Sequence, residues 1–349
     1  MDKPIRFKFK ELSADNRPIG TFSKKGAFDG QQLVLGKTTV PVGAVYRVQK
    51  VLHNRLVLAF AGQSGVDTYP FLVTAGSRDH LARVLNVAVS ANIAELHRRQ
   101  LAASQRGGSF RAEECPFCGA TIDLSDMPVT PQTYCLYCDT VYTRRDDRPR
   151  EENRYRLCQR CGLYAQPQVF TSFYFYFFLV VWGYRQRTEA LCHACMRNEA
   201  WKMLGANLLF LLGLPTAIYQ LVRSYFGGSA RSAAFAGLDG ANALVHRGRF
   251  EAAVAAYEAV AGRQAACAGV RHNQALALCR LANWSEAARY LEHALRDCSN
   301  HAPSYALLLA CYERLGRPSE AQALRVRWEG ADSAPVPTEE EAGSSAGPL

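Results

Sequence analysis

Eight cysteines of this chain are arranged in four Cys-x-x-Cys pairs. The pairs are Cys115/Cys118, Cys135/Cys138, Cys158/Cys161 and Cys192/Cys195. A gap of two residues lets both sulfurs of a pair face one centre, and Zn²⁺ prefers four thiolates in a tetrahedron at about 2.3 Å. Such pairs indicate metal ligands in a reducing compartment rather than disulfides. We therefore expect two structural Zn²⁺ sites, one formed by the first two pairs and one by the last two.

The spacing of the pairs separates two modules. Sixteen residues lie between Cys118 and Cys135, with Gly119 placed to support the turn after the first pair, and this pattern resembles a zinc ribbon. Thirty residues lie between Cys161 and Cys192. We expect this second set to close its own site, with His193 as a bystander inside the last pair rather than a ligand.

An aromatic stretch without charge, residues 169–184, lies inside the second module. A helix of sixteen residues would separate its ends by roughly 24 Å, which would pull the two halves of the metal site apart. Phe and Tyr suit strands, so we expect a hairpin whose outward strand covers 173–182, with Gly183 near the turn. Its aromatic face would need a cover, and either a membrane interface or another domain could supply it.

A second apolar stretch, residues 203–222, has no charge and is flanked by Lys202 and Arg223. Its length predicts a membrane anchor, while Pro215 in its middle leaves a span, a re-entrant segment and a buried core helix as alternatives. The last two cysteine pairs followed by an apolar segment with a central proline resemble a bacterial zinc-ribbon membrane module of unknown function. That resemblance implies a zinc knuckle placed against a membrane.

Residues 1–104 predict a small β domain closed by one helix. Alternating strands fill the part up to Ala75, with turns at Asp29-Gly30 and Gly36-Lys37, and a helix with Ser77 as its cap follows. This order of elements resembles a pleckstrin-homology-like domain. The resemblance implies binding of lipid headgroups or peptides, and it assigns no binding residue here.

A 34-residue period appears near the end of the chain. The segments "GRFEAA", "ANWSEA" and "GRPSEA" begin at residues 248, 282 and 316. Three alanines keep the register: Ala253, Ala287 and Ala321. The period resembles tetratricopeptide repeats, which implies stacked helix pairs that bind proteins. Four further cysteines in this region are expected to be isolated small core residues: Cys267, Cys279, Cys298 and Cys311.

Together these patterns predict a multidomain α+β chain. Its expected parts are a pleckstrin-homology-like β-roll with a closing helix at 1–104, zinc ribbon 1 at 111–145, zinc ribbon 2 with the aromatic hairpin at 155–200, an apolar membrane segment at 201–226, an all-α repeat array at 232–329 and a disordered acidic tail at 330–349.

The function predicted from these parts is not enzymatic. The chain has none of the common catalytic motifs, and a site closed by four thiolates leaves no position for a substrate. We expect a membrane-associated, cytosol-facing scaffold that binds a protein partner through residues 232–329 and the membrane through 203–222, with 169–184 as a second membrane contact. The formal charge is +10, and the segment 1–110 holds sixteen basic side chains against seven acidic ones. This basic surface supports an alternative, a soluble zinc-ribbon regulator that binds nucleic acid.

Overall fold

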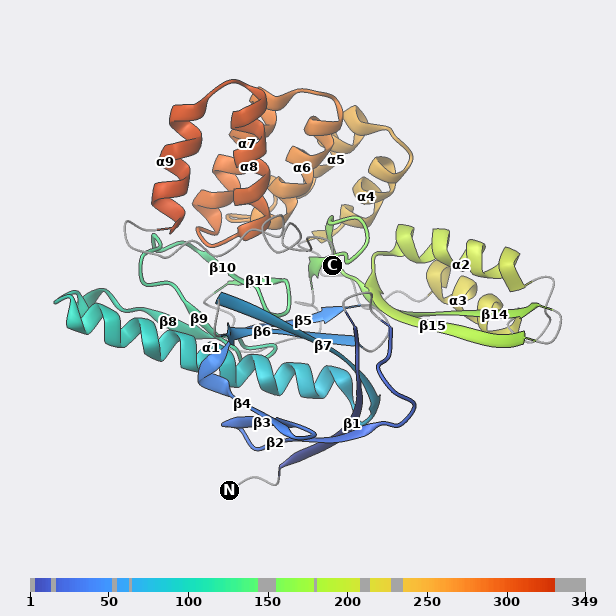
Figure 1. The fold of residues 1–349 in the computed structure, drawn as a ribbon. Helices are drawn as coiled ribbons and strands as arrows, with labels where there is room; N and C mark the ends of the chain where they lie inside the picture. The colour runs from blue at the N-terminus through green and yellow to red at the C-terminus, as the bar shows by residue number, and fades with distance from the viewer. Residues whose placement is uncertain are drawn as a thin grey trace.

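The computed structural model describes residues 4–13, 17–51, 55–62, 65–143, 155–178, 181–207, 214–226 and 235–329. The fold is mixed α+β, with a sheet at the N-terminal end and helices at the C-terminal end. In Figure 1 the sheet and one long helix lie at the bottom, the helical array at the top, and the cysteine modules between them. The acidic tail predicted to be disordered lies outside the described residues.

Seven antiparallel strands form the N-terminal sheet. They are β1 (Ile5–Glu11), β2 (Lys24–Phe28), β3 (Gln32–Leu35), β4 (Thr38–Pro41), β5 (Val45–Val51), β6 (Arg55–Gly62) and β7 (Gly65–Ala75). Their order in the sheet is β4-β3-β2-β1-β7-β6-β5, so the central strand β1 joins two meanders. The β3–β4 turn falls at Gly36, whose φ of 64° suits glycine.

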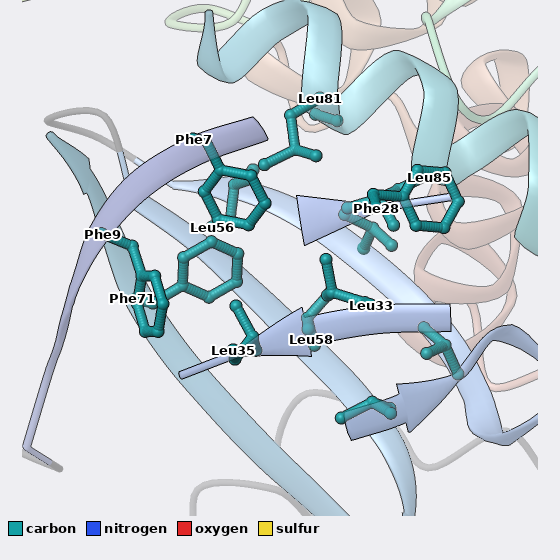
Figure 2. Close-up of a cluster of buried hydrophobic side chains, with 14 of the residues drawn as sticks. Phe7, Phe9, Phe28, Leu33, Leu35, Leu56, Leu58, Phe71, Leu81 and Leu85 are labelled. Carbon is teal, nitrogen blue, oxygen red and sulfur yellow. The ribbon is translucent and has the colours of Figure 1, made fainter. Parts of the chain in front are cut away.

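The alternating pattern of β1 places its aromatic residues on one face of the sheet. Phe7 and Phe9 are buried, while Arg6 and Lys8 beside them are exposed. Figure 2 shows the two phenylalanines beside Phe71 in the core that the sheet shares with the following helix. The predicted β domain with a closing helix is therefore present. Its resemblance to pleckstrin-homology-like domains stays a prediction.

Helix α1 (Arg78–Ala103) connects this sheet to the first cysteine module. It begins where the sequence predicts, because the Ser77 hydroxyl accepts a hydrogen bond from the His80 N–H at 3.2 Å. Leu81 and Leu85 pack into the core of the sheet. From the module, the Thr121 N–H donates to Ser90 Oγ at 2.9 Å. One helix thus contacts both the N-terminal sheet and the first cysteine module.

The two cysteine modules share one sheet. The first module forms a separate two-stranded sheet from β8 (Ala112–Glu114) and β9 (Thr121–Asp123), and it contributes β10 (Gln132–Cys135) and β11 (Thr140–Thr143) to the shared sheet. The second contributes β12 (Arg156–Leu157) and β13 (Tyr164–Ala165). The order β10-β11-β12-β13 makes a single four-stranded sheet in which β10 and β13 are the edges. The modules are therefore joined by backbone pairing and not only by the chain.

The aromatic stretch forms the long hairpin of β14 (Gln168–Phe178) and β15 (Val181–Leu191). The strands pair from Gln168↔Leu191 to Phe178↔Val181, so they return both halves of the second module to one place. The predicted hairpin is present, but its turn is not near Gly183, which pairs with Tyr176 inside the ladder.

The membrane anchor predicted at 203–222 is wrong. The stretch is divided between helix α2 (His193–Asn207) and helix α3 (Leu214–Phe226), and residues 208–213 between them lie outside the described part. In the part of the chain that the structure describes, no helix is both long and apolar enough to cross a bilayer. Pro215 is the second residue of α3, where proline starts a helix rather than kinking one. Both helices pack against the hairpin, as Figure 1 shows at the right.

Three helix pairs form the C-terminal array within residues 235–329. They are α4 (Leu238–His246) with α5 (Phe250–Ala261), α6 (Ala268–Arg280) with α7 (Trp284–Asp297), and α8 (Ala302–Arg314) with α9 (Pro318–Glu329). The second helices begin at Phe250, Trp284 and Pro318, so they keep the period seen in the sequence. The three alanines in register, Ala253, Ala287 and Ala321, are all buried between helices. The predicted helical period is therefore present in the structure.

Candidate metal centres

The first candidate centre brings together Cys115, Cys118, Cys135 and Cys138. Their sulfurs all lie within 4.8 Å of one another, with 3.7 Å between Cys115 and Cys138 and 3.6 Å between Cys118 and Cys135. A tetrahedron with metal–sulfur bonds of about 2.3 Å has edges of about 3.8 Å. The four sulfurs are therefore already spaced as ligands of one Zn²⁺-sized ion.

A tight turn follows the first cysteine of three pairs. The N–H of Gly119 donates to the Cys115 carbonyl, that of Gly162 to the Cys158 carbonyl, and that of Asp139 to the Cys135 carbonyl, at 2.8–2.9 Å. Each donor has a positive φ between 58° and 76°. Glycine adopts this conformation freely, and Asp is one of the few other residues that tolerate it. These turns aim both sulfurs of a pair at one point.

The second candidate centre brings together Cys158, Cys161, Cys192 and Cys195, again within 4.8 Å. Here the last pair starts helix α2, and the Met196 N–H bonds to the Cys192 carbonyl at 2.9 Å. The Cys192 N–H donates to Cys158 Sγ at 3.3 Å. An amide that donates to a sulfur stabilises the thiolate form that a metal needs.

Proton sharing among the sulfurs agrees with a metal-binding role. In the first centre the pKa of Cys115 is held well below its usual range, chiefly by the hydrogen bond from Cys118 and then by those from Cys135 and Cys138. In the second, Cys161 has the same effect on the pKa of Cys158. The hydrogen bonds among the sulfurs thus favour the thiolate form of Cys115 and of Cys158, and a divalent ion would favour deprotonation of the other ligands.

A histidine that the sequence did not single out lies against the second centre. His246, at the end of α4, places Nε2 at 3.7 Å from Cys192 Sγ and 3.8 Å from Cys195 Sγ. The hydrogen bond with Cys192 raises the pKa of His246, which favours an N–H that donates to the sulfurs. The predicted bystander His193 instead faces Asp239, at 3.3 Å from Nδ1 to the carboxylate.

An ion-pair network stiffens the second centre. Arg160, between the cysteines of its pair, reaches Glu189 on β15 at 3.2 Å and also bonds to Glu199 on α2. Tyr174 on β14 donates its hydroxyl to Glu199 at 2.7 Å. Both carboxylates are more than nine-tenths buried. The network therefore couples the metal pair to the hairpin and to the helix that covers it.

Side chains of the helical array form hydrogen bonds with both edge strands of the shared sheet. At β13, Asn273 Oδ1 accepts from the Tyr164 N–H at 2.7 Å, and Asn273 Nδ2 donates to the Tyr164 carbonyl at 2.8 Å. At β10, Asn300 does the same for Tyr134, at 2.9 and 2.8 Å. Each amide makes the two bonds that a neighbouring strand would make, which closes an otherwise open edge.

Residues from several helices contribute to the hydrogen bonds that hold Tyr164. Asn242 on α4 donates to the same carbonyl at 3.1 Å and accepts from Asn273 and from the Tyr257 hydroxyl. Asn242, Asn273 and Tyr257 are almost fully buried. We call the surface formed by Asn242, Asn273 and Asn300 the clamp face. The sequence gives no sign of it, because these asparagines lie far apart along the chain and form no motif.

The sequence predicts that the four remaining cysteines are isolated, and this prediction is correct for only two of them. Cys267 and Cys298 are buried core residues, in agreement with the prediction. Cys279 on α6 and Cys311 on α8 lie with their sulfurs 3.7 Å apart. Their separation in sequence matches no Cys-x-x-Cys pattern, so only the stacking of helix pairs reveals the contact.

The chain has little similarity to known proteins. No protein-family model and no curated protein matches it. A solved structure of a MamA mutant matches 38% of this chain and 73% of its own length, with 22% identity and a TM-score of 0.27. A likeness at that score carries no argument about fold or partners, so the function has to be inferred from the contacts alone.

Proposed function

We propose that this chain is a non-enzymatic scaffold in which two structural Zn²⁺ ions organise an interaction module. The observation that carries the proposal is the pair of closed four-thiol centres, whose shared sheet is held at both edges by the helical array. Four thiolates around Zn²⁺ leave no position for water or substrate, so such ions stabilise a fold rather than catalyse a reaction. The array would then present a surface to a protein partner.

Thiolate ligands support a reducing compartment for the protein. All twelve cysteines are free thiols, and eight of them must stay reduced to hold metal. The closed thiol centres and the helical array give the scaffold role more support than the alternative role in nucleic-acid binding.

Metal content of the purified full chain tests the proposal. We expect two zinc ions per chain by elemental mass spectrometry. Cys135→Ser and Cys195→Ser should each retain one, because each removes a ligand from a different centre. Cys279→Ser, a thiol outside both centres, is the matched control and should retain two. A wild-type chain that holds one ion or none at saturating zinc would contradict the proposal.

A further inference from the structure

The clamp face recognises backbone rather than a particular side chain. Asn273 and Asn300 each use both polar atoms of one amide to bond the N–H and the carbonyl of a single residue. Any extended segment offers the same pair of groups. The two hydrogen bonds that each of these asparagines makes are the ones that a neighbouring β-strand would make with the edge of a sheet.

The residue that Asn273 or Asn300 binds is in both cases a tyrosine, and its ring packs against a residue of the helical array. The Tyr164 ring lies directly on Gly269 of α6, where even an added Cβ would come within 2.4 Å of it. Its neighbours in this core include Leu238 and Val270. At the other clamp, the Tyr134 ring meets His301 edge-on with 5.0 Å between centroids. The preferred occupant is thus an extended segment with an aromatic residue at the clamp.

The metal centres hold these occupants in position. Tyr134 directly precedes the ligand Cys135, and Tyr164 follows the ligand Cys161 by three residues. The Cys158 N–H also bonds to the Leu163 carbonyl, next to Tyr164, at 2.9 Å. A segment tethered so closely has a high effective concentration at the clamp and would exclude a competitor from solution.

We propose that the clamp face is a binding groove for an extended, tyrosine-bearing polypeptide segment, which the chain fills with its own metal modules. While the centres hold metal, the internal segments occupy the groove. When metal leaves the second centre, Tyr164 loses its tether and the groove becomes open to a segment of another protein. This inference rests on the scaffold role proposed above and names the partner chemistry and its control.

A synthetic peptide tests the groove in the full chain. The probe spans residues 160–168, carries Cys161→Ser and a fluorescent label, and is followed by anisotropy. We expect the zinc-loaded protein to bind it at least about tenfold more weakly than the chelator-treated protein, since the internal Tyr164 segment competes for the same two backbone hydrogen bonds. A probe with Tyr164→Ala should not bind either form.

Two variants keep the test decisive if chelation unfolds the helices. In the Cys195→Ser protein, the second centre lacks one ligand, so Tyr164 loses its tether and the probe should bind without chelation. Adding Asn273→Ala to that variant should abolish binding, while adding Gln264→Ala, outside the clamp face, should leave it unchanged. Circular dichroism confirms that the array stays helical in each case.

The outcomes separate this inference from the scaffold proposal. Probe binding that needs Asn273 supports the groove. If neither the Cys195→Ser protein nor the chelated protein binds the probe, or if binding survives Asn273→Ala, the groove inference is wrong. Two zinc ions per chain would still support the scaffold role in that case, whereas their absence would remove the basis of both.

Discussion

At the scale of single residues, each candidate metal centre combines cysteines that the sequence marks with supporting groups that it does not mark. The two-residue gap identifies each cysteine pair because it is a local property of the chain, and the order of the pairs correctly predicted which four sulfurs meet. The supporting groups come from elsewhere. His246 lies 51 residues after the nearest ligand in sequence, on a helix of the repeat array, and nothing in its local sequence marks it.

A change at His246 should act on one centre alone. We expect His246→Phe to speed the loss of metal from the second centre about tenfold, because groups that donate to metal ligands commonly contribute this much to retention. The measurement is zinc release to a coloured chelator, followed as two phases. The first centre lies outside the reach of His246, so its phase serves as an internal control. Identical kinetics in variant and wild type would show that His246 only fills space.

At the scale of elements, the close approach of α6 to the shared sheet depends on one glycine. An added Cβ at Gly269 would lie 2.4–2.6 Å from three atoms of the Tyr164 ring. Asn273 also holds the tyrosine backbone through both its N–H and its carbonyl, so a shift of Tyr164 away from α6 would strain these two hydrogen bonds. Gly269→Ala should therefore destabilise the array by overpacking strain of about 1–3 kcal/mol, against a gain in helix propensity of about 1 kcal/mol.

A second helical glycine supplies the matched control. Gly240 on α4 has nothing within 4 Å of an added Cβ, so Gly240→Ala should raise stability through helix propensity alone. Thermal unfolding followed by circular dichroism compares the two variants with wild type. An increase in stability for both would mean that Tyr164 does not fill the space beside α6.

Elements also show where prediction from sequence succeeded and where it failed. The repeat helices begin in the predicted 34-residue steps because each helix pair is a local unit with its own small residues, such as Ala253 and Ala287. The membrane prediction for 203–222 failed because the hydropathy of the whole stretch does not show that it is divided between two helices. Pro215 starts a new helix there, and both helices pack against the hairpin. The hydrogen bonds of Asn273 and Asn300 to the sheet edges could not be predicted from the sequence, because they depend on how the helix pairs stack.

At the scale of the whole molecule, the described parts form a continuous series of contacts. Helix α1 joins the N-terminal sheet to the first module, the shared sheet joins the two modules, and the clamp face joins that sheet to the array. A disturbance at one junction should therefore reach its neighbours. The junction between β10 and the array should respond to pH, because it contains two buried histidines, His272 on α6 and His301 at the start of α8.

These histidines form a chain of neutral hydrogen bonds. His301 Nδ1 lies 2.7 Å from Ser304 Oγ, which lies 3.2 Å from His272 Nδ1. A hydroxyl has one donor and two acceptor positions, so Ser304 can bridge two uncharged imidazoles by donating to one ring and accepting from the other. Burial lowers the pKa of His272 from 6.5 to about 4 and holds that of His301 well below its usual range.

The sign of the pH effect follows from these shifts. Between pH 6.5 and 4 the unfolded chain binds a proton at His272 and the folded chain does not, so stability falls as the pH falls through this window. A shift of that size corresponds to about 3 kcal/mol.

We expect the stability of His272→Asn, which keeps a polar atom near Nδ1 but does not titrate, to fall less steeply with pH than that of wild type. The measurement is urea unfolding at pH 7, 6, 5 and 4.5. Acid also protonates the thiol ligands in both proteins, so the difference between the two proteins isolates His272. If His272→Asn follows wild type at every pH, the neutral imidazole at this junction does not set the acid limit of the fold.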